Sequence, residues 1–198
     1  AERGKIRPDF RVIDHEWFKL VEDCQNSKAW GIVSIKRRRI GASWRAAADI
    51  LHDCVFKKHF RAGMNSKTET DSRNLFKNVK YIFQNLPEWM RPQATASDRR
   101  DFMDFSYYVK DANGNRIRKG NESSVYSVAP VPQAHEGAGV GKIIMDESGK
   151  YNVLDLWQFA EDCLKVNTRR VGMPIIFGTV GDITKEGRGL LEMWKNAD

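Results

Sequence analysis

The chain has 198 residues, of which 33 are Lys or Arg and 26 are Asp or Glu, giving a formal charge of +7. Its 41% of hydrophobic residues are enough for one folded domain, which excludes collagen-like, mucin-like and largely disordered classes. No apolar run approaches about 18 residues, so no membrane-spanning helix is expected. Three widely spaced cysteines favour reduced intracellular thiols, and the positive charge favours an anionic partner such as nucleic acid or nucleotide.

The N-terminal part of the sequence predicts a helix, a strand, a polar loop and a second helix. Residues 11–23 carry apolar side chains mostly at helical spacing, with Asp14 as a possible cap. Residues 29–35 form a short run rich in β-branched side chains, which is typical of a buried strand. Beyond the loop at 36–43, the apolar residues between 44 and 55 fall on one helical face.

The rest of the chain continues this alternation of strands and helices. Asn113-Gly114-Asn115 predicts a turn between two strands, with the basic cluster Arg116, Arg118 and Lys119 lying between them. The alternation predicts an α/β fold with a mainly parallel sheet and helices on both faces. The further predicted strands are 60–64, 102–109, 123–129, 142–146 and 173–178, and the further helices are 68–85, stopped by Pro87, and 153–166.

The loop at 36–43 has the frame of a phosphate-binding (Walker A) loop. It lies between a strand and a helix, with Gly41 at the sixth position and Ser43 at the eighth, where a hydroxyl can bind Mg²⁺. Lys36 replaces the usual first glycine and Ala42 replaces the usual lysine, so the positive charge has moved to the front. A basic surface run that binds nucleic acid, or a localisation signal, is an equal alternative for this loop alone. The candidate ATP-binding residues are Lys36, Arg37, Arg38, Arg39, Ile40, Gly41, Ala42 and Ser43.

Two adjacent carboxylates, Asp146 and Glu147, follow the apolar strand at 143–145. In phosphate-loop ATPases the first carboxylate of such a (Walker B) pair holds magnesium and the second polarises the attacking water. Acidic residues also favour helix N-termini, so the pair alone is a weak signal. Its place after the phosphate loop in chain order makes it a stronger one.

A third buried strand ends in Gly178 and Thr179, where a hydroxyl or backbone group can sense the γ-phosphate from a neighbouring strand. The alternative for this pair alone is a simple strand-to-loop turn. Taken together, the three motifs predict that the carboxyl ends of strands 30–35, 142–146 and 173–178 converge on one crevice.

This combination resembles the ATPase domain of large terminase subunits, the DNA-packaging motors of tailed bacteriophages. Some members of that family carry the lysine at the front of the loop, as Lys36 does, and an arginine that Arg38 matches. The resemblance implies an ASCE-type phosphate-loop NTPase that uses ATP and Mg²⁺. It implies that Glu147, Lys36 and Arg38 are catalytic, that Ser43 and Asp146 bind the metal, and that Gly178 and Thr179 couple hydrolysis to movement.

The resemblance also implies partners and a location. The expected partners are double-stranded DNA, a portal protein and a small terminase subunit, with the motor acting as a homo-oligomeric ring in the host cytoplasm. The expected domain is an ATPase domain, or a fragment of one, over residues 1–198, without the family's nuclease. Two features depart from the family. His135-Glu136-Gly137 stands where many terminases have a trans-acting arginine, and Gln25 lies too close to the loop for the adenine-side glutamine.

Two other functions compete with a motor. A nucleic-acid-binding module with a degenerate, non-hydrolysing NTPase fold would explain Ala42, whereas the retained Ser43, Asp146 and Glu147 favour hydrolysis. A superfamily-two helicase shares an Asp-Glu strand but carries its loop lysine in the usual place. Four basic segments are candidates for DNA or subunit contacts, or simply solvated surface, namely 57–61, 99–100, 116–119 and 169–170.

Overall fold

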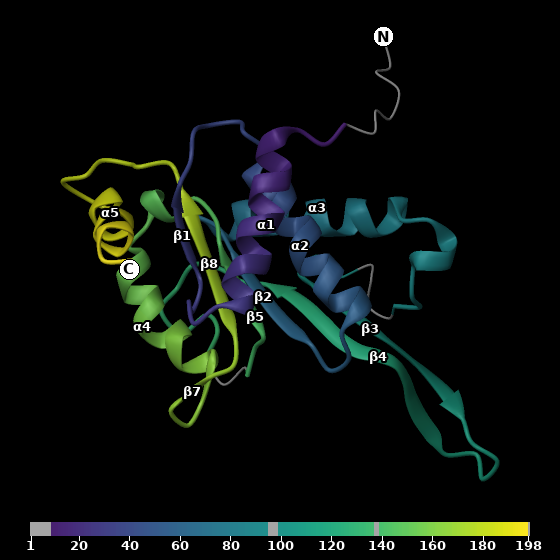
Figure 1. Cartoon of the computed structure of the whole chain (residues 1–198). Coiled ribbons are helices and arrows are strands. Elements are labelled where there is room, and N and C mark those ends of the chain that lie inside the picture. Colours follow the sequence, from purple (N-terminus) through teal and green to yellow (C-terminus); the bar gives the residue numbers. More distant parts are fainter. Residues whose placement is uncertain (1–8, 95–98, 137–138, 198) are drawn as a thin grey trace.

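The computed structural model describes residues 9–94, 99–136 and 139–197, which fold around one six-stranded sheet (Figure 1). Neighbouring strands are parallel, except that β3 is antiparallel to β4, so the predicted α/β fold with a mainly parallel sheet is confirmed. In spatial order the strands are β1 (Ile32–Ile35), β8 (Met173–Gly178), β5 (Lys142–Met145), β2 (Arg61–Asn65), β4 (Arg116–Ser127) and β3 (Phe102–Lys110).

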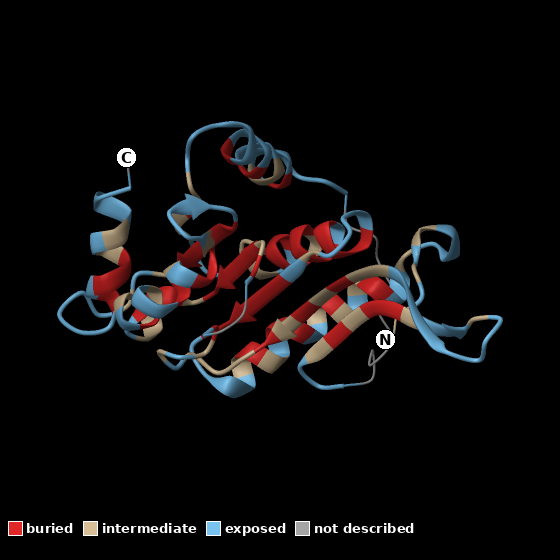
Figure 2. Ribbon diagram, turned by 90° about the horizontal axis from the view of Figure 1, so that it is seen from below, coloured by how far each residue is buried: buried red, intermediate tan, exposed pale blue. Residues whose placement is uncertain are grey.

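Helices cover both faces of the sheet, as predicted. One face packs against α1 (Val12–Asn26), α2 (Ala42–Phe56) and α3 (Glu69–Asn85), and the other against α4 (Val153–Cys163) and α5 (Gly187–Lys195). Because side chains alternate along a strand, Ile175 and Phe177 enter the first core and Ile176 enters the second. The central strands are therefore buried, while the far end of the β3–β4 hairpin is exposed (Figure 2).

Local chemistry explains the helix ends that the sequence predicted. Thr68 is the N-cap of α3, where its hydroxyl accepts a hydrogen bond from the backbone N–H of Asp71, and Pro87 follows the helix end. At α1 the N-cap is Arg11 rather than Asp14. Asp14 lies in the first turn, where its carboxylate accepts a hydrogen bond from the Arg11 N–H at 2.9 Å.

Two sequence-based boundaries are wrong, and one helix was missed. Strand β4 begins at Arg116, so the basic cluster lies inside the strand, because the antiparallel ladder runs as far as the Lys110–Arg116 pair. Helix α4 ends at Cys163, since β6 (Lys165–Val166) and β7 (Arg169–Arg170) form a hairpin in which Asn167 adopts a positive φ. Helix α5 was not predicted at all.

Short elements complete the fold. Two 3₁₀ turns span Glu88–Met90 and Ser148–Lys150, and the second directly follows the acidic pair. The predicted turn at the hairpin tip is confirmed, with Gly114 at φ +81° and the Asp111 carboxylate accepting backbone hydrogen bonds from Asn113 and Asn115. Of the helices within the described residues, none combines the length and the apolar character that crossing a bilayer requires.

Candidate nucleotide-binding site

The predicted convergence of the three strand ends is present in the fold. Strands β1, β8 and β5 are adjacent and parallel, so the loop at 36–43, Thr179 and the acidic pair all follow the same edge of the sheet. The backbone N–H of Lys36 donates to the carbonyl of Gly178 at 2.9 Å, which joins the loop to the end of β8. This edge is where open α/β sheets bind their ligands.

Gly41 shapes the end of the phosphate-loop candidate. It has φ +84° and precedes the first residue of α2, and a Cβ at this position would lie 2.9 Å from Nη2 of Arg11. Its carbonyl accepts the N–H groups of Trp44 and Arg45. The helix N-terminus thus faces the loop, an arrangement that favours a bound phosphate.

Ser43 and Asp146 come together from residues 103 apart in sequence. The Ser43 hydroxyl donates to Oδ2 of Asp146 at 2.5 Å, and Asp146 is only 4% exposed. Burial raises the pKa of Asp146, against the lowering influence of Lys36 and of the Ser43 hydrogen bond. A hydroxyl and a carboxylate are the hard oxygen ligands that suit Mg²⁺. Ser43 and Asp146 are therefore magnesium candidates by their geometry and chemistry, and the described residues contain no cluster of three or more His, Cys, Asp or Glu side chains that could hold a metal.

The Lys36 side chain reaches the acidic pair. Its Nζ lies 2.7 Å from Oε1 of Glu147 and 3.3 Å from Oδ1 of Asp146, and its side chain is 8% exposed. Arg37, Arg38 and Arg39 are exposed, and Arg38 forms no ion pair within the described part of the chain. The structure therefore brings Lys36, and not Arg38, to the carboxylates, and the catalytic roles of both stay predictions.

Glu147 occupies an uncommon backbone conformation, with φ 52°. Its N–H donates to Oδ1 of Asp146 at 2.7 Å, and the hydroxyl of Thr179 lies 3.4 Å from its Oε2. The end of β8 approaches this turn so closely that a Cβ on Gly178 would lie 2.6 Å from the backbone nitrogen of Ser148. Glycine is therefore required at position 178, which keeps Thr179 close to Glu147.

A charged cluster that the sequence did not indicate holds the loop from outside. The guanidinium of Arg45, which is 5% exposed, donates twice to the carbonyl of Ile40 and lies 3.3 Å from Asp14. Arg11 also donates to the Ile40 carbonyl, at 3.1 Å, and is bonded to Asp14. An arginine in the otherwise Ala-rich start of α2 was the only sequence signal for this contact.

Sequence reasoning also missed a buried polar network behind the acidic pair. His135, only 1% exposed, hydrogen bonds to Tyr126 and to Asn65, whose side chain bonds to the hydroxyl of Tyr151. Tyr151 in turn contacts Ser148 at 3.2 Å, directly after Glu147. Isolated polar residues at strand ends carry no local pattern, which is why the network was not visible in the sequence.

The two sequence features that depart from the terminase pattern do not form part of this site. Gln25 lines a cavity at the amino-terminal edge of the sheet together with Lys142 and Met173, so it is not beside the loop. The segment that replaces the family's arginine has His135 buried in the network just described, and Gly137 lies outside the described residues.

Comparison with solved structures places this geometry among known folds. An ATPase-domain variant of the Thermus phage P74-26 large terminase superposes with a TM-score of 0.64, at 17% identity over 87% of this chain and 66% of that one. The HK97 bacteriophage large terminase gives 0.63 at 12% identity, over 94% of this chain and 36% of that one. The large terminase of a thermophilic bacteriophage, solved in complex with ATP-gamma-S, gives 0.56 at 12% identity, covering 86% and 38% of the two chains.

No protein-family model and no curated protein sequence matches the chain. At these identities the structural likeness establishes the fold alone, and the chain spans about a third of the complete HK97 protein. The predicted resemblance is nevertheless borne out in three dimensions. This chain has the fold of the ATPase domain of phage large terminases.

Proposed function

We propose that this chain is an ATP-hydrolysing motor domain of a viral large terminase, which drives double-stranded DNA into a procapsid. One observation carries the proposal: the ends of β1 and β5 and the start of α2 bring Lys36 to both Asp146 and Glu147, and Ser43 to Asp146. Related folds have been solved with ATP-gamma-S and with ADP, which supports ATP as the substrate here.

The residues divide the chemistry between them. Backbone N–H groups of the loop at 36–43 and the start of α2 bind phosphate oxygens, and Lys36 neutralises charge on the β- and γ-phosphates. Ser43 and Asp146 would hold Mg²⁺, which when bound would offset the negative charge of the phosphate oxygens. Glu147 orients and polarises the attacking water. Thr179 transmits a change in the position of Glu147 to the end of β8.

The wider assembly is part of the same proposal. The chain acts as the ATPase domain of its protein, in a ring of identical subunits docked on a portal. A small terminase subunit is a further partner, and the ring acts in the host cytoplasm. Many terminases carry a trans-acting arginine where this chain has buried His135 and acidic Glu136, so the cation that a neighbouring subunit would supply is unassigned.

The non-hydrolysing alternative rests on Ala42. This residue is 3% exposed and packs into the core beside α1 and α3, so its position faces the hydrophobic cluster. Lys36 places a cation beside both carboxylates from the opposite end of the loop. This arrangement favours an active site over a degenerate one.

The test is Mg²⁺-dependent ATP hydrolysis, measured with and without duplex DNA, for the wild type and for Glu147→Gln. We expect the wild type to hydrolyse ATP and Glu147→Gln to bind nucleotide with little turnover, because the amide cannot act as a base. Nucleotide binding by a wild type that does not hydrolyse ATP at any protein concentration would instead support the non-hydrolysing module.

A further inference from the structure

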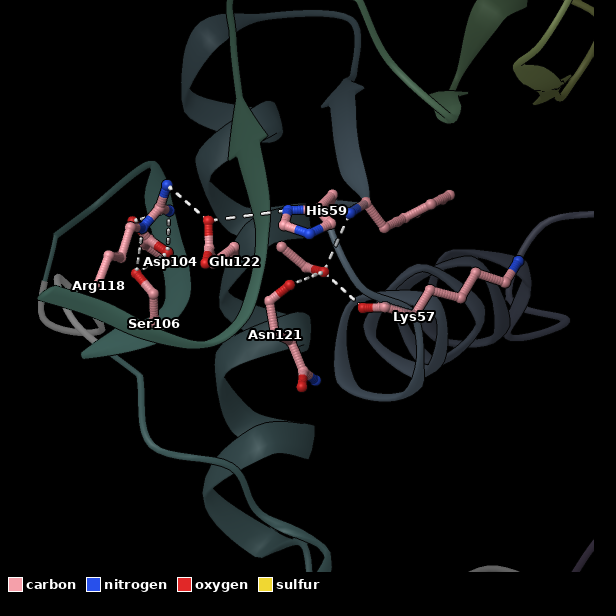
Figure 3. A network of polar contacts seen from close by, with 9 residues as sticks. Lys57, His59, Asp104, Ser106, Arg118, Asn121 and Glu122 are labelled. Carbon is pink, nitrogen blue, oxygen red and sulfur yellow. Dashed lines mark hydrogen bonds and ion pairs between the residues drawn. The ribbon is translucent and has the colours of Figure 1, made fainter. Parts of the chain in front are cut away.

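Two basic segments that lie far apart in the sequence form one surface. The α2–β2 turn, residues 57–61, lies against the base of the β3–β4 hairpin and is joined to it by polar contacts (Figure 3). The N–H of His59 also donates to the carbonyl of Asn121 at 2.8 Å. The hydroxyl of Ser123 donates to the carbonyl of Lys57 at 2.6 Å and accepts the N–H of Phe60 at 3.1 Å. These bonds fix the turn against the hairpin.

Beyond this base the hairpin leaves the body of the protein as a two-stranded ribbon (Figure 1). The register shifts between Asp104 and Ser106, and Gly120 adopts φ +103°, so the strands bend where they leave the sheet. Apart from half-buried Asp111, every residue from 108 to 120 is exposed. The ribbon therefore contributes little to the core, and its sequence is not explained by packing.

The two faces of the ribbon differ in chemistry. The cross-strand pairs Tyr108–Arg118 and Lys110–Arg116 share one face, and the Val109–Ile117 and Tyr107–Lys119 pairs lie on the other, so Lys119 faces away from the other ribbon cations. The guanidinium of Arg116 stacks over the ring of Tyr108 at 4.3 Å, which holds it extended along the ribbon. One face is thus a row of cations with an aromatic ring.

Most of these cations lack an acidic partner. Arg118 is paired with Asp104 at 2.9 Å and with Glu122 at 3.9 Å. Within the described residues, five of these cations form no ion pair. They are Lys58 and Arg61 in the turn, and Lys110, Arg116 and Lys119 in the ribbon. Residues 57–61 and 104–122 together hold seven Lys or Arg against three Asp or Glu. Clustered unpaired cations repel one another, and the fold does not offset this repulsion. Binding of an anionic partner would offset it.

The shape of the ribbon selects among polyanions. The major groove of B-form DNA, about 12 Å wide, admits a two-stranded β-ribbon. The major groove of A-form RNA is deep and narrow, and side chains cannot read it. A flat membrane surface would contact one face of the ribbon and leave the protruding tip unused.

We propose that the β3–β4 ribbon and the α2–β2 turn form a docking surface for duplex DNA, with the ribbon in the major groove and the turn against the adjacent phosphate backbone. The inference deepens the proposed function, because it locates on this chain the partner which that function requires.

The surface lies at the opposite end of the sheet from the nucleotide site. Strand β4 pairs with β2 in parallel over Arg61–Met64, so the ribbon extends past the amino ends of the strands, whereas the loop at 36–43 follows a carboxyl end. Helix α2 begins at the loop and ends beside Lys57, a span of about 22 Å. DNA and nucleotide therefore do not compete for space.

The test measures binding of a fluorescently labelled mixed-sequence duplex to the whole chain, without nucleotide, by anisotropy at several salt concentrations. The ribbon variant is Lys110→Ala/Arg116→Ala/Lys119→Ala. The control, Lys185→Ala/Arg188→Ala/Lys195→Ala, removes the same charge from exposed positions in and just before α5, which packs beside β1 at the other edge of the sheet. All the substituted side chains are exposed, so we expect both variants to keep the wild-type melting temperature.

We expect the ribbon variant to bind DNA at least roughly tenfold more weakly, with the salt slope reduced by up to about one unit per cation removed, and the control to match the wild type. Equal losses in both variants would show that net charge alone is responsible and would overturn the proposal. The proposal also fails if the wild type does not bind the DNA at low salt, or if duplex RNA competes as well as duplex DNA. It fails likewise if the ribbon variant is weakened only in self-association and still binds DNA as the wild type does. Because the titration contains no ATP, the failure of the motor proposal would be seen separately.

Discussion

The ammonium group of Lys36 lies 2.7 Å from Oε1 of Glu147, so the candidate phosphate-binding cation and the candidate base neutralise each other. The same ammonium lies 3.3 Å from Asp146, and all three groups are at least partly shielded from water. A nucleotide γ-phosphate carries more charge than a carboxylate and competes with Glu147 for Lys36. Binding of ATP would then engage Lys36 and release Glu147 to act as the base. Activation of water would be limited to the nucleotide-bound site.

Replacement of Lys36 is the most direct test of the site. We expect Lys36→Ala to reduce ATP turnover by roughly 10²–10³, because a preorganised donor to the phosphate oxygens is lost. Single Ala substitutions at 37, 38 and 39 are measured in parallel, since these exposed arginines are the competitors of Lys36 for the role. Turnover and nucleotide affinity are measured on variants whose melting temperatures match the wild type.

The result also decides between Lys36 and Arg38. If Lys36→Ala keeps near-wild-type turnover while Arg38→Ala loses it, the loop arginine is the catalytic cation and the inference that the lysine has moved to the front of the loop is wrong.

Arg45 should affect binding of ATP more than its hydrolysis. Its two hydrogen bonds to the Ile40 carbonyl and its proximity to Asp14 hold the loop in shape without contacting the acidic pair. A lysine cannot reproduce the planar fork, so Arg45→Lys should raise KM for ATP by roughly tenfold with kcat changed little. Steady-state kinetics would contradict this role if kcat fell while KM stayed constant.

A buried charged cluster at the other end of α2 should matter for stability and not for catalysis. Lys142 is 1% exposed, and its ammonium lies 2.7 Å from Asp49 and 2.6 Å from Asp53. Lys142→Met leaves buried Asp49 without its ion pair, while Asp53 keeps Lys57, and it should lower the free energy of unfolding by about 3–5 kcal/mol. Urea denaturation measures the change, and Lys185→Met, at an exposed lysine, is the control. A loss below about 1 kcal/mol would mean that the carboxylates are protonated or hydrated.

His135 should make stability depend on pH. Burial lowers its pKa to about 4, so the unfolded chain takes up a proton below pH 6.5 and the folded chain does not until far lower. Its stabilising contribution is therefore complete above the unfolded pKa and falls as the pH drops toward 4. Between about pH 7 and pH 5 the loss is roughly 2 kcal/mol. Denaturant unfolding of wild type and His135→Gln at both pH values measures the difference. An identical pH dependence in the two proteins would show that other groups are responsible.

The sequence alone determined the features that depend on neighbouring residues. The alternation of strands and helices specified an α/β fold, and the polar loop at 36–43 and the acidic pair could be recognised because each motif is contiguous. The cap at Thr68 and the turn around Gly114 were also predictable, since a side chain that bonds to its own backbone leaves a short local signature.

The tertiary structure decided which distant residues meet. Lys36 and Glu147 are 111 residues apart, and they touch only because β8 lies between β1 and β5, an order that no local pattern encodes. The ion pair of Arg45 with Asp14 and the joining of His59 to Asn121 depend in the same way on tertiary packing. Ion pairs and buried hydrogen bonds form wherever the backbone brings compatible groups together, so their partners become visible only once the strand order is known.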